Sequence, residues 1–188
     1  MKKRAFLIHG WDGSPEEGWR PWLKQKLENE GFEVVAPAMP NSANPNLNEW
    51  LNHLNEVVGQ VDDQCYFVGH SLGNITILRY LEKLNTEEKV GGVVLVAGFV
   101  SNLGYKELTS FFPGEGWVGW AKINSHCNKF VAIHSDNDPF VSTHYGEEFF
   151  QEKLKAKYIL EHDKKHFSGG DGINELPSAL ESVLEISK

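Results

Sequence analysis

Short apolar runs alternate along this chain with longer stretches in which apolar residues recur at helical spacing. The short runs lie at residues 4–8, 32–36, 65–68, 90–97, 130–134 and 158–160. The helical pattern covers residues 14–31, 44–58, 72–84, 142–154 and 176–186. Strands that alternate with helices in this way favour right-handed crossovers within one sheet. The pattern therefore predicts an α/β fold: a parallel sheet of six strands with helices on both faces.

The start of the first predicted helix carries its own signals. Ser14 can cap the helix, Pro15 suits the first turn, and Glu17 completes a capping box with Ser14. Gly31 is typical of a residue just beyond a helix. We therefore expect this helix to begin at Ser14.

One connection is longer than the others. Residues 99–128 include Phe111, Phe112, Trp117 and Trp120 among several glycines, and a connection of about thirty residues exceeds the usual length between a strand and a helix. We expect either a packed helix with an irregular start or a small lid or pocket wall. The whole chain, residues 1–188, is otherwise expected to form one domain.

Composition narrows the classes of partner. The net charge is −8, and the basic groups at residues 2–4 and 164–165 are too short to follow a phosphate backbone, so nucleic acid is not expected. No stretch approaches the roughly 18 apolar residues of a membrane span, and the apolar run near the N-terminus is too short for a signal peptide. The two cysteines, Cys65 and Cys127, are expected to be buried thiols. We expect a cytoplasmic protein with no cofactor.

The clearest chemical signal is the segment Gly69-His70-Ser71-Leu72-Gly73. It matches G-x-S-x-G and lies between a predicted strand and a predicted helix, where a tight turn lifts the serine hydroxyl out of the backbone. The flanking glycines avoid side-chain collisions in that turn. The segment predicts that Ser71 is a nucleophile.

A serine hydroxyl needs a base to take its proton, and the base needs an acid to orient it. In this arrangement the acid and then the histidine follow the serine, at the ends of later strands. Asp138 and His166 fit that order, although Asp136 and His162 lie in the same two loops and remain alternatives. The spacing of His162 and His166 could chelate a metal on a helix, but no third ligand has convincing spacing, so no metal site is expected.

The loop after the first strand is expected to complete the site. Acyl transfer needs amide donors aimed at the developing oxyanion, and the amides of Leu72 and Trp11 are the candidates. Gly10 would let the backbone approach the substrate, and His9, Gly10 and His70 are expected to lie beside it, with His70 more suited to packing than to reaction. An apolar pocket wall could come from five aromatic residues: Trp11, Phe99, Trp117, Trp120 and Phe140.

Several segments together resemble a known family. They are IHGWDGSPEEGWRPWLKQKL, APAMPNSANPNLNEWL, FVGHSLGNITILRYLE, GGVVLVAGF, HSDNDPFV and KKHF. The chain resembles the small α/β-hydrolase family of retinoblastoma-binding protein 9 and the bacterial YdeN-type hydrolases. This resemblance implies a shortened α/β-hydrolase fold without a large cap domain. It also implies Ser71, Asp138 and His166 as the reacting set, which favours Asp138 over Asp136 and His166 over His162.

The sequence thus predicts a serine hydrolase that cleaves a small carboxylic ester through an acyl-enzyme on Ser71. A thioester or amide substrate, a small peptidase, and a protein-interaction module that keeps the hydrolase fold remain alternatives. The expected partner is a small ester-type molecule, and the sequence assigns no oligomeric state.

Overall fold

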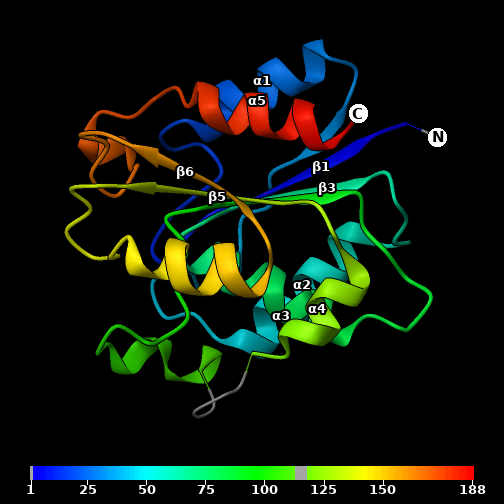
Figure 1. Cartoon of the computed structure of the whole chain (residues 1–188), viewed down its shortest axis with the longest axis horizontal. Coiled ribbons are helices and arrows are strands. Elements are labelled where there is room, and N and C mark those ends of the chain that lie inside the picture. The colour runs from blue at the N-terminus through cyan, green and yellow to red at the C-terminus, as the bar shows by residue number, and fades with distance from the viewer. Residues whose placement is uncertain (1, 113–117) are drawn as a thin grey trace.

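The six predicted strands form one parallel sheet. The computed structural model describes residues 2–112 and 118–188, and Figure 1 shows the sheet between two layers of helices. The strands lie in the order β2-β1-β3-β4-β5-β6, with every neighbouring pair parallel. Their bounds are β1 (Arg4–Ile8), β2 (Glu33–Val35), β3 (Cys65–His70), β4 (Gly92–Val96), β5 (Phe130–Ser135) and β6 (Lys157–Glu161). The prediction of a six-stranded parallel sheet is confirmed.

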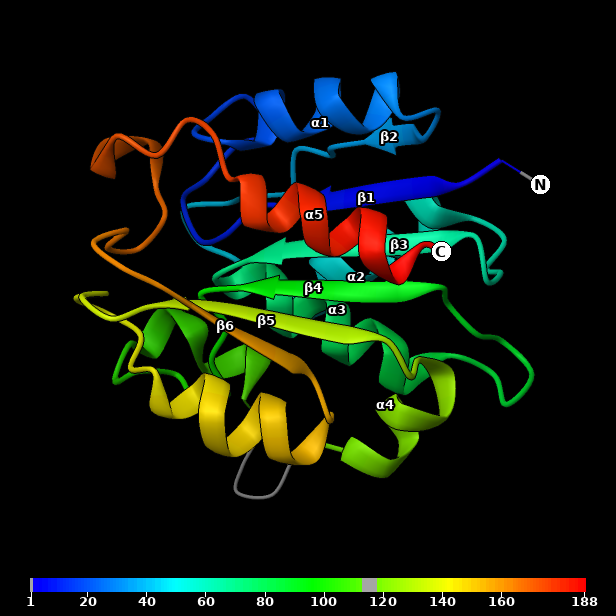
Figure 2. The same ribbon diagram turned by 45° about the horizontal axis from the view of Figure 1, so that its top comes forward.

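Helices cover both faces of this sheet, as the alternating pattern predicts. On one face lie α1 (Arg20–Asn29) and α5 (Pro177–Ile186), and on the other lie α2 (Leu47–Val58), α3 (Leu72–Lys83) and α4 (Trp120–His126) (Figures 1 and 2). β3, β4 and β5 are buried along their whole length. Continuous apolar strands of this kind need cover on both sides, which explains the two helical layers.

The first helix begins later than the sequence predicts. The carboxylate of Glu17 does accept a hydrogen bond from the amide of Ser14, at 3.1 Å, but α1 starts only at Arg20. The cause is Gly18, whose φ of +59° is left-handed and cannot continue a right-handed helix. The predicted start at Ser14 is therefore wrong, and residues 15–19 form turns and a bend instead.

The long connection after β4 contains a short 3-10 helix, η1 (Lys106–Phe111), and then α4. Leu108 and Phe111 of η1 are buried in one of the two core clusters, where the ring of Phe111 contacts that of Trp50 in α2. Trp117 lies outside the described residues. The helix predicted at 142–154 is instead a π-helical segment, η2 (Tyr145–Gln151), and a third short segment, η3 (Gly169–Asp171), precedes α5.

Both cysteines are buried and unpaired, as expected. Burial raises the pKa of Cys65 to about 11 and that of Cys127 to about 12. Because a thiolate is the reactive form, both side chains behave as inert core thiols near neutral pH.

Parallel strands place all their carboxyl ends at one edge of the sheet, and ligands of α/β proteins bind beyond that edge. The loops that follow β1, β3, β5 and β6 therefore emerge on the same side (Figure 2). These loops carry Ser71, Asp138 and His166, the three residues predicted to react.

Candidate active site

Ser71 occupies a strained turn between β3 and α3. Its φ of 53° and ψ of −121° are rare for a residue with a side chain. The turn is held by Val96 at the end of β4, whose carbonyl accepts hydrogen bonds from the amide of Ser71 (2.9 Å) and from the side chain of Asn74 (2.7 Å). Gly73 packs so closely on the end of β1 that a Cβ there would lie 2.7 Å from the carbonyl oxygen of His9. The elbow thus fixes the hydroxyl of Ser71 at the carboxyl edge.

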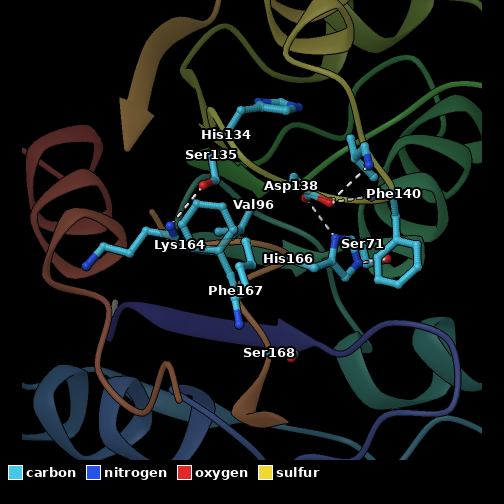
Figure 3. A network of polar contacts seen from close by, with 12 residues as sticks. Ser71, Val96, His134, Ser135, Asp138, Phe140, Lys164, His166, Phe167 and Ser168 are labelled. Carbon is cyan, nitrogen blue, oxygen red and sulfur yellow. Dashed lines mark hydrogen bonds and ion pairs between the residues drawn. The ribbon is translucent and has the colours of Figure 1, made fainter. Parts of the chain in front are cut away.

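Three predicted residues meet in a hydrogen-bonded chain (Figure 3). The Nε2 atom of His166 lies 3.0 Å from the Oγ atom of Ser71, and its Nδ1 atom lies 2.8 Å from the Oδ2 atom of Asp138. Since a carboxylate only accepts, Nδ1 carries the proton and Nε2 is left to accept from the serine hydroxyl. This is the tautomer that a base for Ser71 needs.

Asp138 is fixed independently of His166. Its second oxygen, Oδ1, accepts hydrogen bonds from the amides of Phe140 (2.9 Å) and Val141 (3.0 Å). The side chain of Asp138 is 1% exposed and that of His166 is 15% exposed, so water screens their interaction little. Both oxygens of the buried carboxylate therefore accept hydrogen bonds.

The alternative pair, Asp136 and His162, lies elsewhere in the same loops. The two side chains are joined at 2.5 Å on the surface, where they are 39% and 75% exposed, and Asp136 also accepts from the amide of Asp163. The hydrogen bond from His162 holds the pKa of Asp136 below its ordinary value, and the same bond raises the pKa of His162. This pair ties the two loops together at the surface, whereas Asp138 and His166 lead to Ser71.

The loop after β1 lies directly against the serine. A Cβ added to Gly10 would come within 2.8 Å of the Cβ atom of Ser71 and within 3.4 Å of its Oγ atom. Trp11 follows in the same loop, and its indole donates to the carbonyl of Ala43. Leu72 is the first residue of α3, where an amide has no acceptor within its own helix. Both predicted donor amides therefore belong to segments that border the hydroxyl.

His9 is turned inward. Its Nδ1 atom donates to the carbonyl of Gly10 at 2.8 Å, and its Nε2 atom accepts from the amide of Met39 at 2.9 Å. The ring is 1% exposed, and burial lowers its pKa. With both nitrogens used inside the protein, His9 fixes the loop that carries Gly10, and it is not among the described residues that line the cavities beside Ser71.

Two cavities meet at Ser71, and both are bordered by Trp11 and His166. One, of about 320 Å³, lies between the loop after β1 and the loop after His166, and its wall includes His70 and Arg20. The other, of about 220 Å³, is apolar. Its remaining wall comes from five residues: Phe99, Leu103, Tyr105, Leu108 and Phe140.

The predicted pocket wall is found in part. Phe99 and Phe140 line the apolar cavity with Trp11, whereas Trp120 stacks on Phe149 away from it. Sequence reasoning missed Leu103, Tyr105 and Leu108, which come from the long connection after β4. The unusual length of that connection was the available signal, but length alone does not reveal which side chains face the serine.

Comparisons with known proteins show the family of this chain. The family model described as serine hydrolase matches residues 5–185. The chain belongs to the serine hydrolase family. It is 32% identical to the YdeN protein of Bacillus subtilis over 94% of this chain and 92% of that one. It is also 30% identical to the serine hydrolase RBBP9 of Rattus norvegicus, over 96% and 95% of the two chains.

Solved structures support the same family and fold. The crystal structure of the YdeN protein from Bacillus subtilis superposes with a TM-score of 0.89 and 28% identity, and 98% of each chain is covered. The Est1E protein of Butyrivibrio proteoclasticus gives a TM-score of 0.74 over 98% and 88% of the chains, and at 16% identity it shows the shared fold alone. The predicted α/β-hydrolase fold and the predicted family resemblance are confirmed.

Within residues 2–112 and 118–188, no group of three or more His, Cys, Asp or Glu side chains is arranged to hold a metal ion. In the same part of the chain, no helix has both the length and the apolar character needed to cross a membrane.

Proposed function

We propose that this protein hydrolyses small carboxylic esters through a covalent acyl-enzyme on Ser71. The observation that carries the proposal is the hydrogen-bonded chain from Ser71 through His166 to Asp138, with separations of 3.0 and 2.8 Å. Separations of this size lie within proton-transfer reach. Membership in the serine hydrolase family supports the same chemistry.

In the first half of the reaction, the Oγ atom of Ser71 attacks the ester carbonyl while Nε2 of His166 accepts the hydroxyl proton. The carboxylate of Asp138 stabilises the imidazolium that forms. The amides of Trp11 and Leu72 donate to the negative oxygen of the tetrahedral intermediate. When this intermediate collapses, the bond to the alcohol oxygen breaks and His166 returns its proton to the departing alcohol.

In the second half, a water molecule takes the place of the alcohol. His166 accepts a proton from the water as its oxygen attacks the acyl carbonyl, and the same two amides stabilise the second oxyanion. Collapse breaks the bond to the Oγ atom of Ser71, which regains the proton from His166. The carboxylic acid is released and the free enzyme is restored.

The apolar cavity supports a small substrate with an apolar group. Its volume of about 220 Å³ is below the roughly 300–1,000 Å³ of typical ligand pockets. Leu103 lines the cavity and is not fully buried, so a larger side chain there would reduce the available space. In a series of p-nitrophenyl esters, we expect Leu103→Trp to shift the preferred acyl chain toward shorter lengths. An unchanged chain-length profile would argue against acyl binding in this cavity.

Labelling with a fluorophosphonate tests the proposed nucleophile directly. We expect one adduct in the intact mass of the wild-type protein, none in Ser71→Ala, and one in the control Ser125→Ala, whose exposed hydroxyl lies at the end of α4. A wild-type mass that stays unchanged, with no turnover of any ester, would refute the proposal and favour a protein-interaction role.

A further inference from the structure

The backbone around His166 is held by side chains from other parts of the chain. The Nε2 atom of His70 donates to the carbonyl oxygen of His166 at 2.8 Å. The indole of Trp19 donates to the carbonyl of the next residue, Phe167, at 3.0 Å. The rings of His70 and His166 also touch, with centroids 5.1 Å apart. None of these contacts belongs to the hydrogen-bonded chain that ends at Ser71.

The partners of His70 allow only one arrangement of its proton. Because a carbonyl oxygen can only accept, the proton of the neutral ring must be on Nε2. The Nδ1 atom then accepts, and it faces NH1 of the Arg20 guanidinium at 3.5 Å, which can only donate. A second proton on Nδ1 would meet that donor. Arg20 therefore favours the neutral tautomer that donates to His166.

Arg20 is itself fixed and buried. Only 4% of the residue is exposed, and its Nε atom donates to the carbonyl of Ser14 at 2.8 Å. The carboxylate of Glu17 lies 3.7 Å from its guanidinium and offsets part of its charge. Burial lowers the pKa of Arg20. Burial lowers the pKa of His70 well below its ordinary value, and repulsion from a protonated His166 and from Arg20 lowers it further. His70 is thus neutral at physiological pH.

His166 needs such support because its loop is strained. The residues on either side, Lys165 and Phe167, have φ of 48° and 55°, although neither is glycine. Backbone of this kind persists only where surrounding contacts hold it. Asp138 and Ser71 hold the ring of His166 from one side, and His70 holds its main chain from the other.

We propose that His70 and Arg20 are positioning residues for ester hydrolysis. Arg20 fixes the tautomer of His70, and His70 anchors the carbonyl of His166 so that the imidazole stays within reach of Ser71. This inference rests on the proposed function. It assigns His70 a role that acts through the main chain of His166.

The test replaces His70 by a residue of similar shape that cannot donate. We expect His70→Phe to lower kcat about ten- to a hundredfold, because a displacement of about an ångström at a reacting group has effects of that size. We expect KM to stay within about twofold, since His70 does not line the apolar cavity that is proposed to bind the acyl group. The matched control is His126→Phe: His126 is 1% exposed and its Nδ1 atom also donates to a carbonyl, that of Glu88, far from Ser71. This control should keep the wild-type kcat while losing stability to a similar degree.

Two further variants separate positioning from general stability. The side-chain amide of His70→Gln can donate from the ε position and should recover part of the lost kcat. Arg20→Met keeps the His70 ring but removes the guanidinium that donates to its Nδ1 atom. In this variant, the downfield NMR signal of the proton between His166 and Asp138 should be weaker than the same signal in His126→Phe. If His70→Phe does not fold, the positioning role is tested with Arg20→Met, through its kcat and the same NMR signal.

The outcomes are distinct. Two results would overturn the positioning role while leaving Ser71 as nucleophile. One is that kcat for His70→Phe and Arg20→Met is no lower than for His126→Phe. The other is that KM rises by the same factor by which kcat falls. The failure of the wild-type protein to react with a fluorophosphonate would instead overturn the proposed function itself.

Discussion

The contact between Gly10 and Ser71 provides the sharpest test of how the site is built. Gly10 does not have a positive φ, so alanine can adopt its backbone conformation without torsional strain. The added methyl would, however, lie 2.8 Å from the Cβ atom of Ser71 and 3.2 Å from the carbonyl oxygen of His70. Since carbon atoms in contact prefer about 3.5–4.0 Å, Gly10→Ala requires a movement of close to one ångström.

The serine side of this contact cannot move easily. The amide of Ser71 is bonded to Val96, and the elbow continues directly into the buried helix α3. The loop after β1 must therefore shift outward and carry the amide of Trp11 away from the position in which we propose that it binds the oxyanion. Loss of one such donor lowers kcat by about 10²–10³. Overpacking of this size costs about 1–3 kcal/mol of folding free energy, so a folded variant is expected.

The assay compares kcat for a p-nitrophenyl ester with the free energy of unfolding in urea, for the wild type, Gly10→Ala and a control. Gly119→Ala is a suitable control because, among the residues that the structure describes, its methyl would meet the end of the flexible Glu82 side chain, in a part of the chain distant from Ser71. A folded Gly10→Ala variant whose kcat stays within about threefold of wild type would refute the oxyanion role of this loop.

Two other predictions follow from the geometry and the buried charges. Asp138→Asn should lower kcat about 10⁴-fold by removing the carboxylate that orients His166, whereas Asp136→Asn should leave kcat near normal; the reverse order of the two rates would identify Asp136 as the acid. The free energy of unfolding should fall as pH drops below about 6.5, by up to about 1.4 kcal/mol per pH unit for each histidine that the fold keeps neutral. Burial lowers the pKa of these histidines in the folded protein, so the unfolded chain binds more protons as the pH falls. If urea titrations between about pH 7 and pH 5 gave a constant free energy of unfolding, these histidines would not be held neutral by the fold. These residues are His9, His70 and His134.

The sheet could be predicted because its signals are local. Each apolar run is bounded by polar or turn residues, and the order of strands and helices leaves few topologies open. The segment at residues 142–154 shows the limit of this reasoning. Its spacing predicts an ordinary helix, but the backbone there forms the π-helical η2, in which Gly146 packs against the rings of His134 and Tyr158. That packing depends on strands distant in the sequence.

The site was predictable to the extent that its chemistry follows chain order. Ser71, Asp138 and His166 each follow a strand, and parallel strands bring such loops to one edge. Choosing between Asp138 and Asp136 from spacing alone was not feasible, since both lie in one turn. The structure separates them by burial: Asp138 is held by two amides beneath the surface, and Asp136 faces solvent with His162.

The late start of α1, at Arg20 and not at Ser14, also bears on how His166 is positioned. A helix running from Ser14, as the capping signals suggest, would carry Trp19 and Arg20 in its second turn. The left-handed Gly18 instead ends the preceding turn where its backbone packs on Gly169, in the loop just beyond His166. Trp19 and Arg20 then enter the protein together, one reaching the carbonyl of Phe167 and the other reaching His70. A side chain is disfavoured at this φ, and a Cβ on residue 18 would lie 3.1 Å from the amide nitrogen of Gly169. Glycine at position 18 therefore suits the close packing through which Trp19 and Arg20 support the loop of His166.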